Sequence, residues 1–475
     1  MKQADRHFIN GAWRASKGDT QFPVVNPATE EEFGSVALGA KSDIDDAVAA
    51  AKAAFPGWSQ TTRAERCAYI ERILQAYEKK SEAIAQALTQ EMGAPLRLAR
   101  QQAAMAMRHM EIALEVLDAF DFETIEGGCK ILRDPVGVSG AITPWNAPAS
   151  QLICKTAPAF AAGCVVIAKP SEHAPFSARL VAEAIAEAGL PDGVFNLVFG
   201  NAAAGAALSA HPDVDMISFT GSAAGGGAAA QAAAPTIKRV HQELGGKGAN
   251  IILDDADIEA AVKTGVAAMM FHSGQTCGAP SRMLAPRRFY KDIVEIAVSA
   301  AQALVVGDPL NEGTELGPLA NRPQYQRVLA MIAAGEKEGA RRAAGGQRPG
   351  GLDKGFFIKP VIFTDVEPTM TIAQEEIFGP VLCIIPYEDD DEAVAIANGT
   401  PFGLTGYVQS SDAQRAARVA ARLRAGYVSI NYPPIDFRAP FGGYGRSGNG
   451  RQFGVYSLES YLETKAIIRA APWDA

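Results

Sequence analysis

The spacing of hydrophobic residues predicts that the first third of the chain is helical. Apolar side chains recur three or four positions apart over residues 44–55, behind a Ser42 and Asp45 pair that is typical of a helix N-terminal capping box. The same spacing continues over residues 67–77. A third helix, rich in alanine and methionine, is expected over residues 96–118.

From residue 138 onward, short apolar runs alternate with alanine-rich stretches of helical pattern. Strands are expected at about 138–142, 164–168, 194–199, 215–219 and 237–241, and helices at 174–188 and 222–233. This alternation predicts parallel strands joined by right-handed crossovers, and therefore a doubly wound sheet. A ligand of such a sheet is expected at the carboxyl ends of its strands.

A second alternating series begins near residue 247. Its expected elements are a helix at 256–271, strands at Val381–Pro386, Gly403–Gln409 and Tyr427–Asn431, and helices near 390–398 and 412–424. We therefore expect an α/β fold with two doubly wound α/β domains. The first comprises residues 1–119 and 139–245, the second comprises 246–446, and residues 120–138 and 447–475 follow neither series.

The composition excludes several classes of function. The 475-residue chain is 48% hydrophobic and 20% charged, which is ordinary for a soluble globular protein. A formal net charge of −9 without a basic block argues against nucleic-acid binding. The six cysteines show neither a C-x-x-C pair nor zinc spacing, so we expect reduced thiols in the cytoplasm and no metal. No signal peptide or long apolar run is found, so no membrane contact is expected.

Two short motifs, Glu243–Lys247 and Gly274–Cys277, carry the most informative chemistry. Cys277 stands 34 positions after Glu243, among small and polar residues that leave a thiol accessible. Glu243 opens a Leu-Gly-Gly turn that can approach such a thiol with little steric obstruction. A thiol nucleophile can form a thioester, and a carboxylate base can activate the water that cleaves it. A cysteine taken alone is more often a buried structural residue, but these neighbours favour catalysis.

Four further motifs each allow two interpretations. Residues 219–222, followed by Gly225–Gly227, can bind a phosphate at a helix start or form a packing turn. Lys169–Glu172 can hold ribose hydroxyls or lie in a solvated loop. Thr143–Asn146 can supply an oxyanion-hole amide or a helix cap. Glu375–Pro380 places carboxylates beside an aromatic ring, or is simply solvated.

In this order and spacing, the motifs resemble those of the NAD(P)-dependent aldehyde dehydrogenases, from Phe8–Gly11 to Tyr461–Lys465. The resemblance implies that Cys277 is the nucleophile, Glu243 the general base, and Asn146 an oxyanion-hole donor together with the N–H of Cys277. It also implies cofactor contacts from seven residues: Trp145, Lys169, Glu172, Gly221, Ser222, Glu376 and Phe378. The first domain is then expected to be a Rossmann-like cofactor domain and the second the catalytic domain. Residues 120–138 and 447–475 are expected to be a bridging element that builds a homodimer or homotetramer.

The expected reaction is oxidation of an aldehyde to its carboxylic acid. NAD is expected in preference to NADP, because the carboxylate of Glu172 would accept hydrogen bonds from ribose hydroxyls and repel a 2′-phosphate. Ala223–Ala224 and Gln452 depart from the family pattern without touching this chemistry. The alternatives are a semialdehyde dehydrogenase that transfers its thioester to coenzyme A, and a non-catalytic structural or binding protein that kept the fold.

The aldehyde itself is expected to be aromatic or otherwise bulky. Small side chains on the helix after Asn146 are expected to widen the substrate tunnel, and two phenylalanines to line it: Ala147, Ser150, Cys154, Phe271 and Phe437. The rival is a semialdehyde whose carboxylate pairs with Arg438.

Overall fold

The structure, a computed structural model, describes residues 2–470 and Trp473. It opens with strands: β1 (Lys2–Ala4), β2 (Arg6–Ile9), β3 (Ala12–Ala15), β4 (Thr20–Asn26) and β5 (Glu31–Leu38). The expectation of helix is therefore wrong for residues 2–38. β2 pairs with a strand far along the chain, through Phe8 and Leu197. The other pairings lie within residues 2–38, β2 with β3 and β5 with both β1 and β4, and cross-strand packing stabilises such short strands.

Three long helices follow: α1 (Lys41–Trp58), α2 (Arg63–Met92) and α3 (Leu96–Ala119). The predicted cap of the first helix is wrong by two residues. The carboxylate of Asp43, not that of Asp45, accepts the N–H of Ala40 at 2.8 Å. Asp45 instead pairs with Lys41 on the exposed face of the helix, at 2.7 Å.

The predicted parallel strands form the centre of an eight-stranded sheet of order β22-β12-β11-β8-β9-β10-β2-β3. They are β8 (Val138–Ile142), β9 (Val165–Lys169), β10 (Phe195–Leu197), β11 (Met216–Thr220) and β12 (Arg239–Glu243). The helices between them are α4 (Pro148–Ala162), α5 (Pro175–Glu187), α6 (Ala202–Ala210) and α7 (Ala223–Ala233). Every residue of β8 and β9 is buried, because helices cover both faces of the sheet.

The second series forms a seven-stranded sheet of order β15-β16-β17-β14-β13-β19-β20, parallel except for the pair β15 and β16. Its strands are β13 (Ala249–Ile252), β14 (Arg282–Pro286), β15 (Arg341–Ala344), β16 (Val361–Thr364), β17 (Val381–Tyr387), β19 (Thr405–Gln409) and β20 (Tyr427–Ile430). Its helices are α8 (Ile258–Met270), α9 (Tyr290–Ala303), α10 (Arg322–Lys337), α11 (Thr371–Gln374), α12 (Asp390–Asn398) and α13 (Ala413–Ala420).

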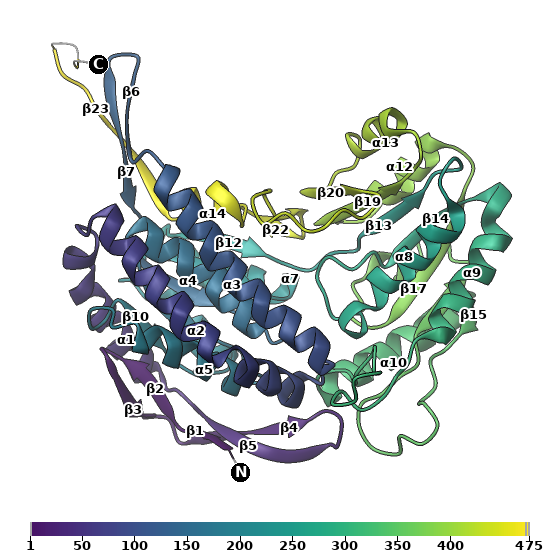
Figure 1. Cartoon of the computed structure of the whole chain (residues 1–475), viewed down its shortest axis with the longest axis horizontal. Helices are drawn as coiled ribbons and strands as arrows, with labels where there is room; N and C mark the ends of the chain where they lie inside the picture. The colour runs from purple at the N-terminus through teal and green to yellow at the C-terminus, as the bar shows by residue number, and fades with distance from the viewer. Residues whose placement is uncertain (1, 471–472, 474–475) are drawn as a thin grey trace.

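The remaining elements connect these two bodies. β18 (Phe402–Gly403) pairs with β21 (Tyr444–Gly445), and β22 (Gly448–Asn449) joins the edge of the first sheet beside Glu243. After α14 (Gly454–Ser460), β23 (Leu462–Ile467) pairs with β7 (Cys129–Pro135), which also pairs with β6 (Glu123–Glu126). These three strands project from the body as an arm (Figure 1).

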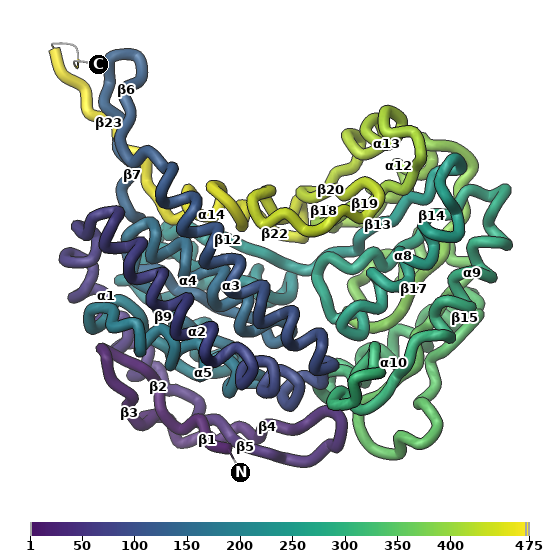
Figure 2. Tube along the Cα trace, viewed as in Figure 1, coloured from purple at the N-terminus to yellow at the C-terminus, as the bar shows by residue number. Residues whose placement is uncertain are grey.

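The two α/β bodies lie on opposite sides of the view, with α2 to α5 on the left and α8 to α10 on the right (Figure 1). The chain passes from one to the other after β12 and returns after β20 (Figure 2). Both crossings run beside the end of β12, so Glu243 lies where the two bodies meet. Within residues 2–470, no helix is both long enough and apolar enough to cross a bilayer.

Candidate active site

Two segments at the carboxyl ends of the first sheet and one loop of the second body bring the predicted catalytic residues to one place. Glu243 ends β12, Asn146 lies between β8 and α4, and Cys277 follows a short helical turn at Phe271–Gly274. All three residues line one cavity of about 490 Å³. This edge is where an open α/β sheet binds its ligand, as the sequence predicts.

The loop that carries Cys277 is strained and tightly tethered. His272 and Ser273 have φ angles of 52° and 54°, which non-glycine residues rarely adopt. The hydroxyl of Ser273 donates to the carbonyl of Gly317 at 2.8 Å, and Oε1 of Gln275 accepts the N–H of Ala320 at 2.9 Å. These buried hydrogen bonds offset the backbone strain and fix the path of the chain into Cys277.

Gly274 is required by the same loop. Its φ is +71°, and a Cβ there would lie 2.2 Å from the carbonyl oxygen of Gly379. Asn146 reaches the loop from the opposite side, because its Nδ2 donates to the carbonyl of Gln275 at 3.0 Å. The amide therefore lies next to the backbone that delivers the half-buried thiol of Cys277.

Glu243 is buried, and neither of its carboxylate oxygens has a hydrogen-bond partner in the described part of the chain. Burial raises the pKa of Glu243 to about 8, while the cations of Lys155 and Arg451 act in the opposite direction. Lys155 is itself buried on α4, and its Nζ donates to Ser218 Oγ at 3.0 Å. A carboxyl with a pKa this close to neutral can exchange protons during turnover.

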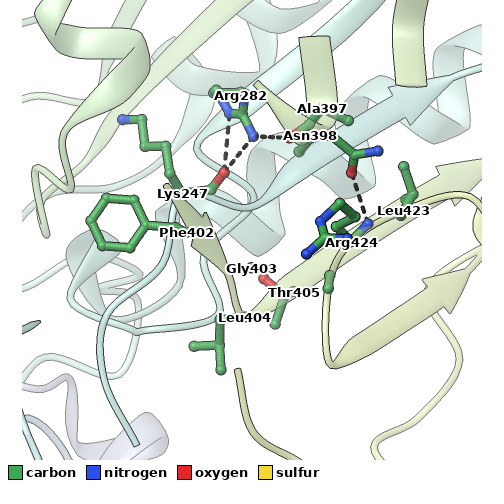
Figure 3. A pocket seen from close by; sticks show the side chains of 13 residues that line it. Lys247, Arg282, Ala397, Asn398, Phe402, Gly403, Leu404, Thr405, Leu423 and Arg424 are labelled. Carbon is green, nitrogen blue, oxygen red and sulfur yellow. Dashed lines mark hydrogen bonds between the residues drawn. The ribbon is translucent and has the colours of Figure 1, made fainter. Parts of the chain in front are cut away.

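The turn after Glu243 is held at both ends. Nε and Nη2 of Arg282 donate to the carbonyl of Lys247 at 3.0 and 2.8 Å (Figure 3). A Cβ at Gly245 would lie 1.9 Å from Oε2 of Glu376, so only glycine lets that carboxylate approach. The N–H of Gly246 then donates to Oε1 of Glu376 at 3.0 Å. Burial raises the pKa of Glu376 to about 7.

Burial also raises the pKa of the Cys277 thiol, and the carboxylates of Glu243 and Glu376 raise it further. The backbone N–H groups of Cys277 and Gly278 act against this and stabilise the thiolate. The two N–H groups can therefore stabilise negative charge that develops at this position.

Five of the seven predicted cofactor residues line the same cavity: Trp145, Gly221, Ser222, Glu376 and Phe378. The rings of Trp145 and Phe378 meet edge to face with centroids 5.4 Å apart. Ser222 caps α7, because its Oγ accepts the N–H of Gly225 at 3.1 Å. The first turn of α7 thus lines the cavity, and the backbone N–H groups of a first helical turn suit a phosphate.

Lys169 and Glu172 lie at the same sheet edge, at the end of the adjacent strand. Nζ of Lys169 donates to the carbonyl of Gly200 at 2.9 Å and lies 4.0 Å from Oε2 of Glu172. Neither residue lines the described wall of the 490 Å³ cavity. Glu172 keeps 21% of its side chain exposed, so its carboxylate is open to a ligand that extends along this edge.

Comparison with known proteins decides the family. Residues 13–467 match the model of the aldehyde dehydrogenase family. The chain belongs to the aldehyde dehydrogenase family. A 3-succinoylsemialdehyde-pyridine dehydrogenase from a Pseudomonas species is 50% identical to it, over 98% of this chain and 99% of that protein. The chain is therefore an oxidoreductase that acts on aldehydes, and these relatives favour neither of the two alternatives.

Solved structures of the family superpose closely on this chain. A variant of aldehyde dehydrogenase C from Pseudomonas syringae, complexed with NAD⁺ and octanal, has a TM-score of 0.98 at 51% identity and covers 99% of this chain and 98% of its own. A Mycobacterium tuberculosis aldehyde dehydrogenase complexed with NAD⁺ has a TM-score of 0.97 at 39% identity, with both chains covered completely. The fold class expected from the sequence is thus confirmed.

Several residues of this aldehyde dehydrogenase site carried no recognisable signal in the sequence. Nε2 of Gln324 donates to the carbonyl of Phe378 at 2.7 Å, and Nη2 of Arg327 donates to that of Glu376 at 2.6 Å. Both residues lie on α10, distant in sequence from the segment that they hold. Lys155 was missed because a lone lysine in an apolar helix pattern gives no indication of the carboxylate that it faces.

None of the predicted tunnel residues lines the described wall of the 490 Å³ cavity. The residue of α4 that this wall contains is Gln151. Cys154 lines a separate hollow of about 20 Å³ with His109 and Phe453. Phe437 packs edge to face on His109, with centroids 4.8 Å apart, and Phe271 is 43% exposed.

Arg438 is already engaged, because its Nη2 lies 2.7 Å from Oε2 of Glu115. A substrate carboxylate would have to compete with this ion pair. Because both side chains of this pair are exposed, the competition is weak, and the pairing of Arg438 with a substrate carboxylate stays a prediction.

Proposed function

We propose that this protein oxidises an aldehyde to its carboxylic acid with NAD, through a covalent bond to Cys277. The observation that carries the proposal is the cavity wall shared by Cys277, Glu243, Asn146 and Glu376. A nucleophile, a base, an amide donor and a carboxylate suited to ribose hydroxyls converge there. Together they are the groups that two-step aldehyde oxidation requires.

In the first step the Cys277 thiol loses its proton to water, and the thiolate adds to the aldehyde carbon to form a thiohemiacetal. The oxygen becomes an oxyanion, held by the N–H of Cys277 and by Nδ2 of Asn146. That amide exchanges its hydrogen bond to Gln275 for one to the oxyanion. Loss of a hydride from the carbon leaves a thioester on Cys277 and restores the carbonyl bond.

Hydrolysis of the thioester completes the cycle. Glu243 takes a proton from water as the water attacks the thioester carbon, and the C–S bond then breaks to release the carboxylic acid and the thiolate. Both free oxygens of Glu243 are available for this water. Since the base serves only while ionised, and its pKa lies at about 8, hydrolysis should accelerate as the pH rises toward that value.

NAD supplies the hydride acceptor when it is bound. Its pyrophosphate suits the start of α7 at Gly221 and Ser222, and its nicotinamide ribose suits Glu376, beside the rings of Trp145 and Phe378. One carboxylate oxygen of Glu376 accepts the N–H of Gly246, which leaves the other to accept a hydrogen bond from a ribose hydroxyl. The NAD⁺ bound in the related Pseudomonas syringae and Mycobacterium tuberculosis structures supports this assignment.

The preference for NAD over NADP is assigned to Glu172, with Lys169 beside it. Glu172→Gln should raise the ratio of kcat/KM for NADP to that for NAD by about tenfold, because a repelling charge near the 2′-phosphate is removed. Glu183→Gln, in a half-buried pair with Arg179, is the matched control. A wild-type enzyme that already favours NADP would contradict the assignment.

We further propose that the aldehyde is bulky and apolar, or aromatic. Cys154 and Phe453 line a separate apolar hollow, and the ring of Phe437 packs on that of Phe453 with centroids 5.3 Å apart. Cys154 is also close enough to Glu243 for the carboxylate to raise the pKa of its thiol. Two relatives are consistent with such a substrate: the Pseudomonas syringae enzyme complexed with octanal, and the 3-succinoylsemialdehyde-pyridine dehydrogenase.

The arm formed by β6, β7 and β23 supports assembly into a homodimer or homotetramer. It carries exposed apolar side chains at Ile125, Ile467 and Ile468 while projecting from the body (Figure 1). Such residues are typical of a surface that a second copy covers. We place the enzyme in the cytoplasm, where its six free thiols would remain reduced.

The proposed activity is tested by NADH formation with a panel of aldehydes, including octanal, benzaldehyde and succinic semialdehyde. We expect acid release without added coenzyme A and the highest kcat/KM for the bulky apolar members. Dependence on coenzyme A, or no turnover of any aldehyde, would contradict the proposal. Preference for the carboxylated member would contradict the substrate class alone.

A further inference from the structure

Two hydroxyl groups of β19 converge on one carbonyl oxygen beside the nucleophile. Oη of Tyr407 donates to the carbonyl of Gly278 at 2.6 Å, and Oγ1 of Thr405 donates to the same oxygen at 3.2 Å. β19 is hydrogen-bonded on both sides, to β13 and to β20. The peptide between Gly278 and Ala279, one residue past Cys277, is therefore fastened to an interior strand of the second sheet.

The opposite side of this backbone is equally confined. A Cβ at Gly246, in the turn after Glu243, would lie 3.0 Å from the carbonyl oxygen of Cys277. A Cβ at Gly278 would lie 3.3 Å from Cγ2 of Thr405 and 3.6 Å from Oη of Tyr407. The residues Cys277 and Gly278 are thus packed between the Glu243 turn and β19.

This confinement acts on the sulfur through the N–H of Gly278. That N–H and the N–H of Cys277 lower the pKa of the thiol, whereas burial and the carboxylates of Glu243 and Glu376 raise it. The direction of the Gly278 N–H depends on the orientation of the residue whose carbonyl Tyr407 holds. Loss of that hold would let the N–H turn away from Sγ.

We propose that Tyr407 is a positioning residue: by holding the Gly278 carbonyl, it keeps the Gly278 N–H directed at the Cys277 sulfur. The proposal rests on the assignment of Cys277 as the nucleophile. Tyr407 is suited to the role because burial, together with the neighbouring Cys277 and Tyr427, raises its pKa and keeps its hydroxyl protonated. Its ring is fixed by stacking on Tyr432, with centroids 5.1 Å apart and planes at 25°.

Tyr432 offers a matched control within the same stacked pair. Its hydroxyl is buried but has no hydrogen-bond partner in the described part of the chain. Tyr407→Phe and Tyr432→Phe each remove one buried hydroxyl and keep both rings. Only the first removes a hydrogen bond to the loop that carries Cys277.

The test measures the rate of alkylation of Cys277 by iodoacetamide across a pH series, without NAD, with the modified cysteine identified by peptide mass spectrometry. We expect Tyr407→Phe to raise the apparent pKa of the thiol by about half a unit or more. Its kcat should fall about five- to tenfold, with the KM for aldehyde and the Kd for NAD unchanged. Tyr432→Phe should match the wild type in every measurement.

A wild-type alkylation profile for Tyr407→Phe, or an equal shift in Tyr432→Phe, would overturn the proposal. Thr405→Val removes the longer of the two hydrogen bonds and should give a smaller shift in the same direction. It provides the same test if Tyr407→Phe does not fold. Alkylation needs no turnover, so failure of the proposed function can be recognised separately. In that case aldehyde oxidation by the wild type would survive the modification of Cys277.

Discussion

The nucleophile and the base of this active site are held in opposite ways. The backbone before and after Cys277 is tied down by Ser273, Gln275 and Tyr407, each hydrogen-bonded to a distant segment. Glu243 ends a regular strand, and neither of its carboxylate oxygens is hydrogen-bonded within the described chain. One residue is constrained in position, and the other is left free to bind water and protons.

The difference follows from what each group does. A covalent bond to the aldehyde forms only if the sulfur and the oxyanion donors are placed to within about half an ångström. A base that acts on water needs accessible lone pairs and a pKa near neutral. Tethers supply the first requirement, while burial opposed by the charges of Lys155 and Arg451 supplies the second. Substitutions in the two regions should therefore fail in different ways.

The largest contrast is expected between Cys277→Ala and Glu243→Gln. Removal of the thiol should lower kcat by more than about a thousandfold with NAD binding intact, because no other group in the cavity forms the covalent bond. Glu243→Gln should still form the thioester, giving a burst of about one NADH per active site before a slow steady state. Rapid-mixing absorbance measurements distinguish the two. A full rate of multiple turnover in either variant would refute the mechanism.

Asn146→Ala tests the donor that lies between the two regions. Loss of one oxyanion donor should lower kcat by roughly 10²–10³, with little change in the KM for NAD. Gln151→Ala, in the same cavity wall but assigned no donor role, is the control and should lose far less. Equal losses in the two variants would show that Asn146 acts only by packing.

Gly274→Ala breaks the tethered region without touching the chemistry. A residue with φ +71° whose Cβ would lie 2.2 Å from the Gly379 carbonyl cannot be accommodated without moving the loop. The free energy of unfolding should fall by about 2–4 kcal/mol, and kcat should fall with it. Gly227→Ala is the control, because it lies in α7 with open space around its Cβ and should be neutral or slightly stabilising. Chemical denaturation followed by circular dichroism measures both.

The sequence predicted those parts of the site that depend on local pattern. Asn146, Gly221 and Glu243 are found where apolar strands end, and parallel strands bring such ends together. The wrong assignments come from contacts that the spacing of apolar residues does not reveal. The strands over residues 2–38 pair mostly with one another, and the Asp43 carboxylate accepts the N–H groups of Ala40 and Lys17. The contacts of Arg282, Gln324 and Arg327 with carbonyl oxygens were equally hidden, since any residue can offer that acceptor.

The smallest expected effect lies in the base region, with Lys155→Met. Its cation lowers the pKa of Glu243, which burial raises to about 8, so removing it should raise that pKa further, by about one unit. The midpoint of the rising limb of the pH–rate profile should then move to higher pH, and the rate near neutrality should fall by up to about tenfold. Ser218→Ala removes the hydrogen-bond partner of Lys155 but keeps the charge, so its profile should stay close to that of the wild type. An unmoved midpoint in Lys155→Met would show that burial alone sets the pKa.

The raised pKa of Glu243 also predicts how stability depends on pH. Stability should fall as the pH rises, whereas the hydrolysis rate should increase. A carboxyl group whose folded pKa is raised stabilises the fold fully below its unfolded pKa of about 4.5, and loses that contribution as the pH rises through about 8. The wild type should therefore lose stability over the pH range in which hydrolysis speeds up. Glu243→Gln cannot ionise and should lack this part of the decline. Unfolding midpoints of the two proteins should stay parallel below about pH 4.5, diverge progressively between about pH 4.5 and 8, and stay parallel again above that. A constant separation would mean that Glu243 is already ionised in the folded protein, and that the base is activated by its position alone.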